Sequence, residues 1–192
     1  MDISRHLRSR NISEYILYLW QLEDLLRSLQ FSPQAIYSQF IAPREELSPV
    51  RQQEIFMWYR EMCELLESEG KRQSGHLEHT LHLIADLQDL HLRLLHLPIG
   101  ARYRTLWVTL EEVLPDLRAV LSEEETPAEI SDIELCFRAL YGAVLYKLKG
   151  ENGRGAVEDT IAYISPVIAE LSSTYGKVER GECDLYWGVP NS

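Results

Sequence analysis

The sequence is poor in basic residues and in cysteine, and it contains no long apolar run. Its 192 residues include 19 Lys and Arg against 30 Asp and Glu, so the formal net charge is −11. Nucleic acids and anionic membranes both attract basic surfaces, so we expect neither as a partner. No segment approaches the roughly 20 apolar residues that span a bilayer, and the N-terminus has no signal-peptide pattern. We therefore expect an acidic cytoplasmic protein.

The three cysteines, Cys63, Cys136 and Cys183, are widely spaced. They form neither a CxxC pair nor a zinc-binding pattern, so we expect reduced thiols. The sequence also contains no nucleophile elbow, phosphate-binding loop or paired-carboxylate motif. Nothing in it indicates a cofactor, and it assigns no catalytic residue.

Helical periodicity runs through nearly the whole sequence, and no pair of alternating segments predicts a β-hairpin. The pattern predicts an all-α fold, a single-domain helical bundle of six to seven helices spanning residues 1–192. Residues 1–10 are expected to be an N-terminal extension and residues 177–192 an irregular tail. A capping residue indicates a helix start at Asn11. A capping residue followed directly by proline indicates three more, at Ser32-Pro33, Ser48-Pro49 and Thr126-Pro127. Helix ends are expected at Leu29, Pro43, Gly70, just before Pro98, and Gly176.

Two helices have features that need a structural explanation. Pro115 lies inside the apolar stripe of the fifth predicted helix, so we expect a kink or break there. The sixth, over residues 130–149, is apolar nearly all round and is expected to be a buried central helix. Gly142 inside it costs about 1 kcal/mol relative to alanine. Close approach of a neighbouring helix would explain that glycine.

Five of the six histidines lie in residues 76–96, on the fourth predicted helix, which begins near Ser74-Gly75. On a helical wheel His79 and His82 project from the polar face with Asp86, at spacings that can converge on one metal ion. The alternative is a solvated polar face without metal.

His91 is different because it projects from the apolar face, where a histidine needs a hydrogen-bond partner. Glu23 on the first helix is also placed within or beside an apolar face, and it is the first candidate partner. These positions allow two interpretations: separate salt bridges with a satisfied histidine, or a small-molecule pocket. The residues of that possible pocket are Tyr15, Trp20, Glu23, Arg27, His91, Glu134 and Arg138.

Four stretches, in order along the chain, resemble a family of uncharacterised bacterial proteins, domain-of-unknown-function family 4924. They are RNISEYILYLWQLEDLLR (10–27), EGKRQSGHL (69–77), DLHLRLL (89–95) and IELCFRALYGAVLYKLK (133–149). The resemblance implies a cytoplasmic helical protein from bacteria. It brings no activity, cofactor or catalytic residue.

Three functions remain open. The first is a non-enzymatic interaction protein that binds an unknown protein partner or itself, as a homodimer. The second is a small-molecule binding protein or enzyme that uses the Glu/Arg/His positions. The third is metal binding through His79, His82 and Asp86.

Overall fold

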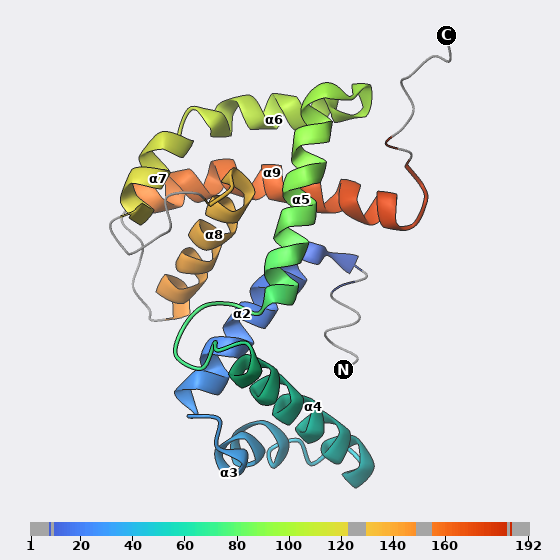
Figure 1. Cartoon of the computed structure of the whole chain (residues 1–192), viewed down its shortest axis with the longest axis vertical. Helices are drawn as coiled ribbons and strands as arrows, with labels where there is room; N and C mark the ends of the chain where they lie inside the picture. The colour runs from blue at the N-terminus through green and yellow to red at the C-terminus, as the bar shows by residue number, and fades with distance from the viewer. Residues whose placement is uncertain (1–7, 9, 123–129, 149–154, 184, 186–192) are drawn as a thin grey trace. The chain divides into compact units, whose positions relative to one another are not determined.

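The protein is all-α in its computed structural model, which confirms the predicted fold class (Figure 1). The structure describes residues 8, 10–122, 130–148, 155–183 and 185, with the backbone alone for 122 and 155–159. Within those ranges there is no strand. The helix start predicted at Thr126-Pro127 lies outside the described residues.

Eight α-helices occur in these ranges, slightly more than predicted. They are α2 (Ile12–Ser28), α3 (Pro33–Ile36), α4 (Pro49–Ser68), α5 (Glu78–His96), α6 (Ala101–Glu111), α7 (Leu114–Ser122), α8 (Asp132–Leu148) and α9 (Gly155–Glu179). A π-helical turn, η1 (Tyr37–Ile41), continues α3, and a 3₁₀ turn, η2 (Pro98–Gly100), precedes α6. Pro115 lies in the first turn of α7, so the expected break is present between α6 and α7.

The predicted helix starts follow from side-chain caps. The hydroxyl of Ser32 accepts a hydrogen bond from the N–H of Ala35, and that of Ser48 accepts one from the N–H of Arg51, both at 3.3 Å. The side-chain oxygen of Asn11 likewise accepts one from the N–H of Ser13 at 3.1 Å. Such caps bind amides that lack a partner inside the helix, and this fixes where each helix begins.

Two predictions about α8 and α9 were wrong. Helix α9 does not end at Gly176 but continues to Glu179, and Gly181 follows with φ +70°. There the N–H of Glu182 donates to the carbonyl of Lys177, a bond typical of a glycine-terminated helix end. Helix α8 is buried only in its first part, since Tyr146 and Leu148 are exposed.

The chain divides into two compact units, and α2 and α5 supply residues to both. In the unit that includes residues 14–82, α3 and η1 pack with α4 around an apolar core. In the unit that includes residues 83–192, α6 and α8 pack on α9, and α7 packs on α6 and α8. That these units form a single domain remains a prediction.

Among the described helices, none has the length and apolarity needed to cross a membrane.

Two glycines of the second unit, Gly100 and Gly142, differ in how much space surrounds them. A Cβ added at buried Gly100 would overlap the backbone carbonyl of Leu94. A Cβ added at Gly142 would meet no heavy atom of a described residue within 4 Å. Close packing therefore explains Gly100, whereas the expectation that a neighbouring helix explains Gly142 was wrong.

We predict opposite effects on stability for the two alanine substitutions. Gly100→Ala should lower the free energy of unfolding by about 1–3 kcal/mol or more, because a backbone group must move. Gly142→Ala should raise it by up to about 1 kcal/mol, because alanine is the better helix former and nothing obstructs it. Urea unfolding followed by circular dichroism measures both. Similar effects at the two positions would contradict these surroundings.

Candidate functional site

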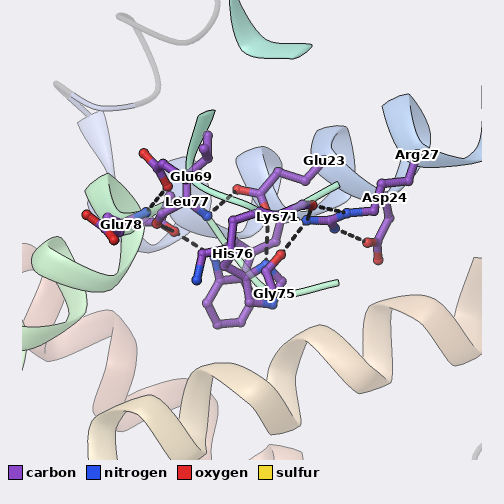
Figure 2. A network of polar contacts seen from close by, with 11 residues as sticks. Glu23, Asp24, Arg27, Glu69, Lys71, Gly75, His76, Leu77 and Glu78 are labelled. Atoms are coloured by element: carbon purple, nitrogen blue, oxygen red, sulfur yellow. Dashed lines mark hydrogen bonds and ion pairs between the residues drawn. The ribbon is translucent and has the colours of Figure 1, made fainter. Parts of the chain in front are cut away.

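Glu23, on α2, is fully buried, and its carboxylate is bound by the segment that precedes α5 (Figure 2). Its Oε2 lies 2.8 Å from Nδ1 of His76, and its Oε1 accepts a hydrogen bond of 3.2 Å from the N–H of Leu77. The guanidinium of Arg27 lies 3.9 Å from Oε2. Burying a carboxylate is costly unless it is paired and hydrogen-bonded, so these contacts explain how Glu23 tolerates burial.

Arg27 binds the same segment through its backbone carbonyls (Figure 2). Its Nε and Nη2 each donate to the carbonyl of Lys71 at 3.1 Å, and Nη2 also donates to the carbonyl of Gly75. Its Nη1 donates to Asp24 at 2.7 Å. We call the side chains of Glu23 and Arg27 the α2 clamp, because one binds an amide and the other binds carbonyls of residues 71–77.

Glu23 of the α2 clamp and Glu69 bind the backbone amides at the start of α5. The N–H of Leu77 donates to Glu23, and the N–H of Glu78 donates to Glu69 at 2.8 Å. Carboxylates are favourable at a helix N-terminus because they accept from its unpaired amides and face its positive dipole end. The helix therefore starts at Glu78 and not near Ser74-Gly75 as predicted. His76 lies in the loop before it, not in its first turn.

Trp20 on α2 makes further contacts with the loop before α5 and with the first turn of that helix. The ring of His76 stacks on that of Trp20, with centroids 3.8 Å apart and planes at 9°. The indole N–H of buried Trp20 donates to the hydroxyl of Thr80 at 3.0 Å, and that hydroxyl donates to the carbonyl of Leu77 at 2.8 Å. Trp20 therefore packs as part of the core that positions this loop.

His79 and Tyr15 form a separate, more exposed pair. The hydroxyl of Tyr15 lies 3.2 Å from Nε2 of His79. Partial burial lowers the pKa of His79, and electrostatic interactions with Arg8 and His82 lower it further. In the part of the chain that the structure describes, no group of three or more His, Cys, Asp or Glu side chains lies close enough together to hold a metal ion. A metal site at His79, His82 and Asp86 thus has no geometric support there.

His91 lies on α5 in the second unit and is 2% exposed. Its Nδ1 lies 2.7 Å from the hydroxyl of Tyr103 on α6, and its ring centroid is 4.1 Å from that of Trp107. Burial lowers the pKa of His91 to about 4, with the charge of Asp132 acting in the opposite direction. The histidine does have a buried hydrogen-bond partner, but that partner is Tyr103. The prediction of Glu23 in that role was wrong, because Glu23 pairs with His76.

A cavity of about 370 Å³ lies among α7, α8 and α9, within the second unit. Most of its lining is apolar, and the α8 side consists largely of small residues. The described lining residues are Val113, Asp116, Leu117, Val120, Leu121, Arg138, Ala139, Gly142, Ala143, Tyr146, Thr160 and Ile161. The open space beside Gly142 is therefore part of this cavity.

Arg138 connects the cavity with Glu134. The Nε and Nη2 of Arg138 donate to one oxygen of Glu134, at 3.0 and 2.7 Å. The predicted i,i+4 pair is therefore present on α8, with both side chains partly exposed.

The seven residues of the possible pocket belong to separate groups. Trp20, Glu23 and Arg27 take part in the contacts around the loop before α5, and Tyr15 pairs with His79. His91 bonds to Tyr103, and Arg138 alone of the seven lies among the described cavity-lining residues. The prediction overlooked the cavity itself. Its one signal in the sequence was Gly142 inside a helix, which we attributed to close approach of a neighbouring helix.

The chain belongs to the family described as a domain of unknown function (DUF4924), whose model matches residues 1–182. This confirms the resemblance seen in the sequence. No curated protein and no solved structure matches the chain. Two of the stretches that carried the resemblance, residues 10–27 and 69–77, contain the α2 clamp and the loop it binds.

We predict that Glu23 contributes far more to stability than the adjacent Asp24. Glu23→Ala should lower the free energy of unfolding by about 3–5 kcal/mol, because it leaves buried partners unpaired. Asp24→Ala, which removes a 43% exposed partner of Arg27, should cost about 1 kcal/mol or less. Urea denaturation of both variants makes the comparison, and equal losses would contradict the role given to Glu23.

We also predict that His91 makes the protein less stable at acid pH. Its pKa of about 4 in the folded state lies below the ordinary value of 6.5, so the unfolded chain binds the proton more readily. Stability is therefore lost as the pH falls from about 6.5 to 4, by on the order of 3 kcal/mol from this group. Unfolding at several pH values should show a shallower decline for His91→Gln, whose side chain does not titrate. Identical pH dependence in the two proteins would contradict the prediction.

Proposed function

We propose that this member of the DUF4924 family binds a small organic molecule in the cavity among α7, α8 and α9. The observation that carries the proposal is the cavity itself, about 370 Å³ and mostly apolar, with the charged side chains of Asp116 and Arg138 on its lining. Small-molecule sites are typically concavities of about 300–1,000 Å³ with an apolar lining and a few polar groups that orient the ligand.

The space in this cavity depends on the α8 residues that line it. Ala139, Gly142 and Ala143 are all small, and Gly142 lies in the interior of a 17-residue helix. Glycine there costs about 1 kcal/mol relative to alanine, and no described neighbour requires it. An isolated glycine inside a helix has a packing or a functional explanation, and packing does not supply one here. Room for a ligand is the explanation that we favour.

The α2 clamp and the His91–Tyr103 pair have a structural role in this proposal. The polar groups of Glu23, Arg27 and His91 are already engaged with other parts of the protein. They are therefore poorly suited to bind a ligand without first breaking those contacts. A protein partner or a homodimer, the leading prediction from the sequence, stays a prediction.

Filling the cavity tests the proposal. A neutral fluorescent probe, N-phenylnaphthylamine, should bind the wild-type protein saturably, with an increase in fluorescence as it leaves water. Gly142→Leu should place a side chain in the cavity and weaken this binding about ten-fold or more, the equivalent of about 1.4 kcal/mol. The helical structure should be kept, because leucine is a better helix former than glycine.

Ala85→Leu provides the matched control, since Ala85 lies on an exposed part of α5 and not on the described lining. This variant should bind the probe as tightly as the wild type does. If wild-type protein shows no saturable binding, or if both leucine variants bind equally well, the cavity is not the ligand site.

A further inference from the structure

Of the two charged residues on the described lining of the cavity, Arg138 has an ion-pair partner of opposite charge and Asp116 has none among the described residues. The positive charge of Arg138 is matched by Glu134, to which it donates through both Nε and Nη2. An anionic ligand at Arg138 would have to compete with this carboxylate, or would lie beside it and be repelled. Arg138 is consequently a weak anchor for an anion.

Asp116, in contrast, has no hydrogen-bond or salt-bridge partner among the described residues. The nearest arginine in the sequence, Arg118, bonds instead to Asp132 and to the carbonyl of Ile130. Asp116 lies in the first turn of α7, where the helix N-terminus stabilises a negative side chain. Its charge is thus present at the cavity and is not cancelled by a cationic side chain.

Among the described residues, these charges give the cavity net negative character. Asp116 and Arg138 are the charged residues of the described lining, the charge of Arg138 is matched by Glu134, and the protein as a whole carries a formal charge of −11. Tyr146, also on the lining, adds an aromatic ring of the kind that attracts cations. The combination of apolar walls, an uncompensated aspartate and a tyrosine complements a molecule with an apolar body and a positively charged end.

We infer that the ligand of this cavity is an organic amine, a cation with an apolar body, and that Asp116 binds its ammonium group. This inference rests on the proposed function and specifies its ligand class. Because Asp116 is exposed, the attraction is partly screened by water and weakens with salt. The expected preference for a cation over a neutral molecule of the same shape is therefore modest, about five-fold at low ionic strength.

Three probes with the same apolar body separate charge from shape: phenylbutylamine, phenylbutanol and phenylbutyrate. Their affinities are measured by displacement of N-phenylnaphthylamine and by calorimetry, at low and at high salt. The wild-type protein should bind the amine most tightly, then the alcohol, then the carboxylate, and salt should reduce the difference between amine and alcohol. Asp116→Asn should lower the affinity for the amine to that for the alcohol, and it should leave the affinity for the alcohol unchanged.

Asp89→Asn is the matched control, because it removes the same charge from an exposed position on α5 outside the described lining. It should retain the amine preference. Equal binding of the three probes, tightest binding of the carboxylate, or the same loss in both asparagine variants would overturn the inference and leave the proposed cavity intact. Failure of all three probes to bind would also overturn the inference, and absence of saturable N-phenylnaphthylamine binding would overturn both the inference and the proposed function.

Discussion

A carboxylate without contact with solvent must find its partners inside the protein, and Glu23 is such a carboxylate. Its partners come from the chain that enters α5: the imidazole of His76 and the amide of Leu77. This one requirement joins α2 to the loop before α5 and fixes the residue at which α5 starts. Arg27 completes the arrangement by binding the carbonyls of that loop, so that donors and acceptors on both sides are satisfied.

The second unit meets the same constraint with a neutral pair. His91 is buried with Tyr103, and burial keeps the imidazole uncharged by lowering its pKa to about 4. A neutral pair needs no counter-charge, so its neighbours can be apolar, as Trp107 beside His91 and Cys136 near Tyr103 are. The cost of this arrangement appears only in acid, where the unfolded chain takes up a proton that the folded protein excludes.

The cavity has a different origin from these satisfied polar pairs. Residues of α7, α8 and α9 line it, and several of those on α8 are small. One of them is Gly142, although glycine has a lower helix propensity than alanine. Most of the polar groups predicted to line a pocket instead form hydrogen bonds or ion pairs with other parts of the protein. The cavity lies instead beside Arg138, which is partly exposed, and Asp116, which is exposed.

Local patterns in the sequence determined the all-α class, the caps at Ser32 and Ser48, the break near Pro115 and the identity of Glu23 and His91 as buried polar residues. Each of these depends on neighbours within one or two helical turns, where spacing is known from the sequence. The tertiary structure alone decided that Glu23 pairs with His76, that His91 pairs with Tyr103, and that Gly142 borders a cavity. The physical reason is that these outcomes depend on which helix faces meet. Periodicity shows which face of a helix is apolar, but not which other helix covers it.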